Sequence, residues 1–263
     1  MNFEITDTTN VGQFCNVFQY LKNITEILNV TFSKDGLYIQ GMDNTHVCMF
    51  ELTLDNTWLS KYKYSSNKES FILAFSSHNL NKILNTRNED QSIYFKYNQD
   101  DDKIEIKFKS KDKKSTTFNK SFKLLLLDIG DITHLNIPEF EYSAEFTTHS
   151  KTLYTIIDQL SQFHEQIAVT CNEDKIEFDA NGDEMSMNVE IKMEDVIEYA
   201  VEEEETINVT FSVNYFKKIC SLQKFTDNVN IKFSNNYPMF VEYKINENNK
   251  LALFLAPKID DDE

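Results

Sequence analysis

The stretch at residues 71–84 reads FILAFSSHNLNKIL, and a second stretch, at 207–220, reads INVTFSVNYFKKIC. In both, an apolar run typical of a strand leads through a Phe-Ser pair into the apolar spacing of a helix. A serine at this junction favours a helix N-cap, because its hydroxyl can accept a hydrogen bond from an unpaired N–H of the first turn. Ser76 and Ser212 are 212 − 76 = 136 positions apart, so the chain carries an internal repeat.

The repeat extends toward the N-terminal side of each half. Apolar residues at helical spacing predict one helix between Val11 and Leu21 and another between Leu153 and Phe163. Each of these helices is followed by a strand, a turn and a second strand. The predicted strands are 28–32 and 37–40 in the first half, and 167–171 and 175–179 in the second.

Further strands follow the second helix of each half, at 92–97 and 228–233. The segment 103–109 alternates strictly between apolar and charged residues, which is typical of a strand with one face in water. Because the strands come in runs and the helices are few, the pattern predicts an α+β fold. It predicts, more specifically, a duplicated domain in which two helices pack on antiparallel sheets.

The halves are joined by the stretch LLLLDIGDITHLNIPEFE at 124–141. This stretch is not rich in glycine or serine, so we expect an extended connector that lies on the surface of a domain. The predicted organisation is an N-terminal domain at 1–125, a connector at 126–141 and a C-terminal domain at 142–263. A second irregular stretch, 193–205, carries seven acidic residues, and we expect it to be a solvated loop.

Composition limits the possible functions. A formal net charge of −17 predicts repulsion from phosphates unless the charges are unevenly distributed. The four cysteines show no zinc-ligand spacing, so we expect them to be reduced and expect no metal. Walker-type, GxGxxG, HExxH and GxSxG motifs are absent, which argues against an enzyme and a cofactor. Without a membrane-length apolar run or a signal-peptide pattern, we expect a soluble intracellular protein with no membrane partner.

Four segments carry a resemblance to a known family, in the right order along the chain. They are GMDNTHVCMFELTL at 41–54, Ile137-Pro138-Glu139 with Tyr142, VEYKI at 241–245 and LAPKIDDDE at 255–263. Through them the chain resembles the proliferating cell nuclear antigen family, the eukaryotic-type DNA sliding clamps. The resemblance implies a non-catalytic DNA polymerase processivity factor that encircles double-stranded DNA without sequence preference and docks replication and repair proteins.

The resemblance also implies that three copies close head to tail into a homotrimeric ring, which uses one heterologous interface three times. In the family, an edge strand of the first domain pairs with an edge strand of the neighbouring copy's second domain. Those strands correspond here to about 117–125 and 182–191. Phe122 and Met187 fall where side chains would pack across the joint. The alternative is that both are ordinary surface or core residues.

In such a ring the repeated helices line the hole, and their polar faces decide the contact with DNA. The cations expected to face DNA are Lys22, Lys82, Arg87, Lys151, Lys217, Lys218 and Lys224. Asn16 and Asp158 stand where the family usually has basic residues, so phosphate contacts should be sparse and sequence-independent. Retention on DNA would then come from encirclement. The alternative for each lysine is a solvated position on a helix surface.

The resemblance finally implies an apolar pocket for the short hydrophobic-aromatic motif of client proteins: polymerases, ligases and nucleases. A rim of methionines, a proline wall and an extended tail suit aromatic anchors. The matching positions are Met42, His46, Val47, Met49, Leu135, Ile137, Tyr237, Pro238, Phe254, Ala256, Pro257, Lys258 and Ile259. For Met42 and Val47 the alternative is core packing.

Other interpretations of the sequence stay open. A monomeric or dimeric processivity factor of viral type would share the duplicated fold without closing a ring. A subunit of a heterotrimeric checkpoint clamp would not self-associate, and an unrelated acidic enzyme would show an activity. We expect the protein in the nucleus, or in a viral replication compartment if it is viral. Glu173 stands where the family has a modifiable lysine, so we do not expect ubiquitin regulation there.

Overall fold

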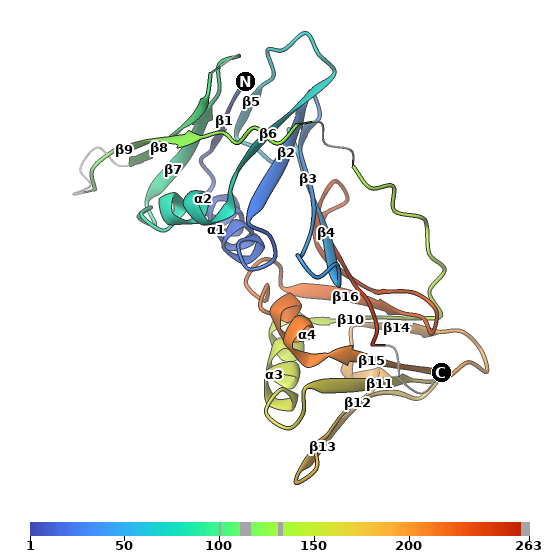
Figure 1. Ribbon diagram of the computed structural model, residues 1–263. Helices are drawn as coiled ribbons and strands as arrows, with labels where there is room; N and C mark the ends of the chain where they lie inside the picture. The colour runs from blue at the N-terminus through green and yellow to red at the C-terminus, as the bar shows by residue number, and fades with distance from the viewer. Residues whose placement is uncertain (100, 111–116, 131–133, 259–263) are drawn as a thin grey trace. The chain divides into compact units, whose positions relative to one another are not determined.

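The computed structural model describes residues 1–99, 101–110, 117–130 and 134–258, which fall into two compact units (Figure 1). The first unit consists of Met1–Asn44, Glu51–Leu135 and Ile245–Lys250. The second consists of Thr45–Phe50, Asn136–Lys244 and Leu251–Glu263.

The two halves of the chain have the same order of elements. The first half contains β1 (Asn2–Ile5), α1 (Thr8–Leu21), β2 (Ile27–Ser33), β3 (Gly36–Met42), β4 (Cys48–Asp55), β5 (Lys61–Lys63), β6 (Ser70–Ser76), α2 (Ser77–Leu84), β7 (Gln91–Lys96), β8 (Lys103–Ser110) and β9 (Lys120–Leu125). The second half contains β10 (Ala144–His149), α3 (Ser150–Leu160), β11 (Gln166–Cys171), β12 (Lys175–Asn181), β13 (Ser186–Lys192), the 3-10 helix η1 (Met193–Asp195), β14 (Glu198–Val201), β15 (Ile207–Ser212), α4 (Val213–Cys220), β16 (Asn228–Phe233), β17 (Met239–Asn246) and β18 (Asn249–Leu255).

In the first unit, α1 and α2 lie side by side against an antiparallel sheet with the strand order β5-β1-β7-β8-β9. A second group of strands has β2 paired with both β3 and β6. Phe3 of β1 stacks on Phe95 of β7 with the ring centroids 4.6 Å apart, and the ring of Phe14 in α1 lies 5.7 Å from that of Phe95. Buried aromatic rings therefore join the helices to the sheet.

The second unit repeats this construction. α3 and α4 lie side by side on a sheet with the order β13-β12-β11-β15, and another group of strands follows the order β14-β10-β16-β17. Phe178 of β12 lies 6.2 Å from Phe216 of α4 and 6.4 Å from Phe146 of β10. The prediction of a duplicated α+β domain, with two helices packed on antiparallel sheets in each copy, is confirmed.

The two predicted serine caps behave differently. Ser76 is the N-cap of α2, and its hydroxyl accepts a hydrogen bond from the backbone N–H of Asn79 at 3.3 Å. Ser212 occupies the same position before α4 but makes no side-chain cap bond. Helix α1 has an N-cap that the pattern did not single out, since Asp7 accepts from the Asn10 N–H at 3.0 Å. Both halves therefore have a serine between strand and helix, but only the first half has the capping hydrogen bond of its side chain.

The prediction that 193–205 is an irregular loop is wrong in part. It contains η1 and β14, which pairs antiparallel with β10. Tyr199 of β14 donates its hydroxyl to the backbone oxygens of Asn172 at 2.5 Å and Lys175 at 3.2 Å. The hydrogen bonds of Tyr199 and the pairing with β10 hold this strand in an acidic stretch, and the one acid of β14, Glu198, is exposed.

Candidate functional site

Acidic residues are almost absent from the four α-helices, which have 14, 8, 11 and 8 residues. Asp158 of α3 is the one acid among them, out of 43 in the chain. The same helices contain Lys82, Lys151, Lys217 and Lys218, so their formal charge is 4 − 1 = +3. A chain with a net charge of −17 therefore has helices that do not repel phosphates.

Most of the cations predicted to face DNA lie on or beside these helices. Lys82 and Lys151 are exposed on α2 and α3. Lys22 is the C-cap residue of α1, and Lys224 is exposed in the turn after α4. Lys218 is exposed on α4, and its ammonium lies 5.0 Å from the centroid of the Tyr215 ring. Their contact with DNA stays a prediction. That prediction requires them to lie on or beside the α-helices, as they do.

Two other predicted cations are engaged within the protein. The ammonium of Lys217 forms an ion pair with Asp158 at 2.7 Å and donates to the hydroxyl of Ser161 at 3.1 Å. The guanidinium of Arg87 donates to three backbone oxygens of the turn that follows α2, among them that of Asn88 at 2.6 Å. Arg87 therefore shapes its own turn, and Asp158 offsets the charge of Lys217.

Strands β9 and β13 are edge strands of their sheets. Phe122 of β9 is half-buried and its ring lies 5.4 Å from that of Phe108. Met187 of β13 is half-buried and lies opposite Ala180, which is fully buried. Each edge thus presents an apolar side chain at the margin of a core and unpaired backbone groups for another strand.

Four exposed large apolar side chains lie at the same two edges. Phe118, just before β9, is 84% exposed, and Leu125 at its end is 54% exposed. Met185, just before β13, is 58% exposed, and Met193, just after it, is 50% exposed. Apolar groups concentrated at open strand edges mark an interaction surface. Sequence reasoning did not single out these four residues, although Phe118, Leu125 and Met185 lie within the predicted edge strands.

The predicted docking residues of the second unit are brought together by the segment after β18. The N–H of Ala256 donates to the carbonyl oxygen of Val47 at 3.0 Å, and the N–H of Lys258 donates to the Thr210 oxygen at 2.8 Å. These bonds hold the extended tail beside the start of β4 and the end of β15. Met49 and Pro257 are half-buried. Ile259 lies outside the described residues.

An aromatic cluster forms the rest of this surface. The ring of Phe140 lies 5.0 Å from that of Tyr237 and 6.5 Å from that of Phe254, and Phe240 lies 5.2 Å from Phe254. Tyr237 is 37% exposed. Sequence reasoning named Tyr237 and Phe254 but missed Phe140 and Phe240. The alternation in FEY at 140–142 was the available signal.

The remaining docking positions behave differently. Ile137 and Pro238 belong to the second unit, where Ile137 is half-buried. His46 adopts a positive φ of 60° in the turn before β4, a conformation that a non-glycine residue adopts rarely. Met42 and Leu135 belong to the first unit.

The connector is fixed to the first unit by a two-point clamp. The side chain of Gln40 donates to the Leu135 carbonyl oxygen at 2.9 Å and accepts from the Leu135 N–H at 2.7 Å. His134 adds a hydrogen bond to the Thr31 hydroxyl at 2.9 Å and an edge-on contact with the ring of Tyr38. Since Gln40 is buried, this paired bond positions Leu135, which is 55% exposed, as an outward apolar group.

Across residues 1–99, 101–110, 117–130 and 134–258, no three His, Cys, Asp or Glu side chains meet as a metal site would require. In the same part of the chain, no helix combines the length and the hydrophobicity needed to cross a membrane.

Family models and curated relatives match nearly the whole chain. The model of the N-terminal domain of proliferating cell nuclear antigen matches residues 7–132, and that of the C-terminal domain matches 136–258. Proliferating cell nuclear antigen of Chaetomium thermophilum is 29% identical over 252 residues, which cover 94% of this chain and 95% of the relative. Proliferating cell nuclear antigen 2 of Drosophila melanogaster is 28% identical over 241 residues, 92% of each chain.

Proposed function

This chain belongs to the proliferating cell nuclear antigen family, and from that membership we propose that it is a DNA sliding clamp and polymerase processivity factor. Three copies close head to tail into a ring that encircles double-stranded DNA. The ring has no catalytic step and needs no cofactor. It acts as a moving platform that a clamp loader places on DNA and on which polymerases, ligases and nucleases dock.

The observation that carries this proposal is the pair of open edges at β9 and β13. Each is an edge strand flanked by large exposed apolar residues. Two different edges on one chain make a heterologous contact, which generates either a closed ring or an open filament. The family closes the ring with three copies, and we propose that Phe122 and Met187 lie at the centre of the joint.

The charge distribution supports encirclement as the means of retention. The acid-poor helices are the surface that DNA would meet, and the acids elsewhere discourage binding to the outside. Arg87 and Lys217 are engaged internally, and we propose Lys22, Lys82 and Lys151 as the cations closest to phosphates. Few phosphate contacts mean a weak affinity with a shallow salt dependence.

The platform role rests on the tail and aromatic cluster of the second unit. The segment 256–258, Tyr237 and Phe254 offer apolar walls and an extended backbone beside the β4 start. We propose that this surface of the second unit binds the hydrophobic-aromatic motif of client proteins.

Topological retention is tested by cutting the DNA. After a clamp loader has placed the protein on nicked circular plasmid, gel filtration should show it eluting with the DNA. One cut with a restriction enzyme should release it within minutes, because a ring slides off a free end. A protein held by charge alone would stay bound to both forms equally, and that result would overturn the proposal. The uncut plasmid, incubated with heat-inactivated enzyme, is the control.

Removing the internal counter-charge of Lys217 should strengthen the contact with DNA. Asp158→Asn frees the ammonium from its 2.7 Å ion pair, and a ring of three copies then gains up to three phosphate contacts. Since log K falls with log salt by about 0.9 per phosphate contact, the salt dependence of DNA binding should become steeper. Fluorescence anisotropy over a salt series measures this slope. The double variant Asp158→Asn with Lys217→Gln should return to the parent slope, and a single variant with the parent slope would refute the prediction.

Two alternatives predict other results. A viral-type processivity factor would appear as a monomer or dimer in the ultracentrifuge, and a checkpoint-clamp subunit would form no self-trimer at micromolar concentration. The family's setting suggests the nucleus, or a viral replication compartment for a viral chain, which imaging of a tagged protein would distinguish. Glu173 is exposed, and as a glutamate it offers no amine for ubiquitin.

A further inference from the structure

Three adjacent strands place one lysine on each side of an asparagine. In the register of the first unit, Asn2 of β1 lies directly opposite Lys63 of β5 and also opposite Lys96 of β7. Residues that face each other across antiparallel strands project from the same side of the sheet. All three side chains are exposed. The sheet itself therefore builds a row of cation, amide and cation.

The neighbouring row of the same strands has a carboxylate at its centre, where this row has an amide. Glu4, two residues further along β1, lies opposite Lys61 and Tyr94, and its carboxylate pairs with Lys61 at 3.1 Å. In the Asn2 row the central residue is an amide and cannot neutralise either lysine. Within the described part of the chain, neither Lys63 nor Lys96 has an ion pair within 4.0 Å.

One acid lies close to this row. Glu105 of β8 is opposite Lys96 on the far side from Asn2. Its carboxylate is engaged by Lys107 at 2.8 Å, and the pKa of Glu105 is lowered chiefly by that hydrogen bond. The row therefore keeps an excess of positive charge.

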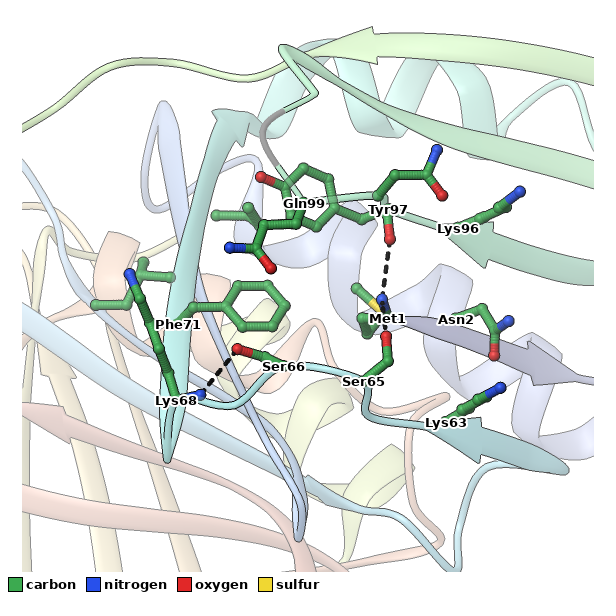
Figure 2. A pocket seen from close by; sticks show the side chains of 13 residues that line it. Met1, Asn2, Lys63, Ser65, Ser66, Lys68, Phe71, Lys96, Tyr97 and Gln99 are labelled. Carbon is green, nitrogen blue, oxygen red and sulfur yellow. Dashed lines mark hydrogen bonds between the residues drawn. The ribbon is translucent and has the colours of Figure 1, made fainter.

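The row forms one wall of a cavity of about 440 Å³ (Figure 2). Lys68 and Phe71 line the cavity across from Lys63 and Lys96, and Ser65 and Ser66 contribute hydroxyl groups. We call this cavity the lysine pocket. Among the residues that the structure describes, its lining includes three lysines and no aspartate or glutamate, in a chain where acids outnumber bases by 43 to 26.

The lysines act on the interior of the pocket. The amino group of Met1 donates to the Ser65 hydroxyl at 3.1 Å and to the backbone carbonyl oxygen of Tyr97 at 2.9 Å. Its pKa is lowered first by burial and then by the positive charges of Lys63 and Lys96. These two ammonium groups are thus close enough to disfavour another cation at this place, and the same field favours an anion.

We propose that the lysine pocket binds a compact polyanion, namely the phosphate chain of a small molecule. Lysines at two sides of the cavity's margin, with the hydroxyls of Ser65 and Ser66 between them, supply several donors for phosphate oxygens. The volume is in the range of small-molecule sites, roughly 300–1,000 Å³. The rings of Phe71 and Tyr97, 5.8 Å apart, give the cavity an apolar wall against which a base or other ring could rest.

The lysine pocket is distinct from the surface proposed to face DNA. β1 runs from the pocket toward α1, and β6 runs from Phe71 at the pocket to Ser76 at the start of α2. Five residues of strand separate these ends by about 16 Å. The inference therefore stands whether or not the protein encircles DNA, and changes in the pocket leave the helix lysines untouched.

The test is a calorimetric titration with inorganic tripolyphosphate and, separately, with adenosine triphosphate, in magnesium-free buffer of low ionic strength. We expect saturable binding of one equivalent per chain that weakens as salt is added. Asn2→Glu, which copies the Glu4 row, and the triple variant Lys63→Gln, Lys68→Gln, Lys96→Gln should each weaken binding by about tenfold or more. If adenosine triphosphate binds more tightly than tripolyphosphate, the ring takes part; equal affinity assigns the site to the phosphates alone.

Matched variants separate the pocket from general charge. Lys61→Gln removes a lysine from the same strand outside the pocket, and Gln19→Glu adds one negative charge on α1. Both should bind tripolyphosphate within about twofold of the parent. Thermal unfolding monitored by circular dichroism confirms that each variant is folded. Unsaturable binding by the parent, or equal losses in Asn2→Glu and Gln19→Glu, would overturn the proposal.

Discussion

Met187→Glu should turn a trimer of about three times 30.9 kDa into single chains. Met187 sits on the edge strand β13 opposite buried Ala180, so in the proposed ring its side chain is enclosed by the neighbouring copy. A carboxylate there would be buried without a partner, which costs about 3–5 kcal/mol at each joint. All three interfaces of the ring carry the substitution, so the free energy of assembly is reduced at each of them and the trimer should dissociate. Sedimentation velocity at micromolar concentration measures the mass.

A mixing experiment makes the prediction specific to a head-to-tail joint. Phe122→Glu on β9 should also give single chains, because it damages the other side of the same contact. The Met187→Glu chain keeps an intact β9, and the Phe122→Glu chain keeps an intact β13. Mixed in equal amounts, they can form one good joint and no second one, so the expected species is a dimer with one copy of each. Closed trimers in the mixture would contradict the head-to-tail arrangement.

Ser186→Glu is the matched control for this experiment. It adds the same charge to the adjacent residue of β13, which is exposed and projects from the opposite face of the strand. This variant should remain a trimer. Loss of the trimer in Ser186→Glu as well would mean that charge near the strand, and not the apolar joint, controls assembly.

The sequence predicts the fold because the same pattern occurs twice. The Phe-Ser junctions, the apolar helix stripes and the alternating strand at 103–109 each depend on neighbours in the chain, and all of them appear as expected. β14 was not predicted, because its pairing with β10 depends on a sheet edge and on the tertiary bond of Tyr199. The acidic sequence pattern of 193–205 predicts neither the pairing with β10 nor the hydrogen bond of Tyr199.

The functional surfaces were predicted less completely, for a similar reason. Lysines can be placed on helices from periodicity alone, but their partners cannot. Asp158 and Lys217 are 59 positions apart, and their ion pair depends on the packing of α3 beside α4. Asn2, Lys63 and Lys96 come from three separated strands, so their row exists only once the register is known. Charge clusters of this kind depend on strand order and register, which the sequence pattern does not give.

Tyr237→Ala together with Pro257→Ala should abolish client binding while leaving the assembly intact. Tyr237 is exposed beside Phe140, and Pro257 lies in the tail that Val47 and Thr210 anchor through Ala256 and Lys258. Truncating aromatic anchors at the centre of an interface costs 2 kcal/mol or more, about thirtyfold in affinity. Calorimetry with a synthetic peptide that carries an apolar residue followed by two aromatic ones measures the loss.

The control is Ile197→Ala, which truncates an apolar side chain of the second unit that is 46% exposed and outside the aromatic cluster. It should bind the peptide as the parent does. Ile137→Ala with Pro257→Ala tests the connector side of the same surface and should also abolish binding. Parent-like affinity in both double variants would remove this surface as the docking site.

The two losses should be independent of each other. The docking residues that carry the prediction lie in the second unit, away from the sequence of either edge strand. A monomeric Met187→Glu chain should therefore bind the peptide with parent affinity per chain, and the Tyr237→Ala, Pro257→Ala protein should still sediment as a trimer. A ring that cannot dock and a docking chain that cannot close would each fail in replication, for different reasons. Loss of both properties in one variant would instead indicate unfolding of the second unit.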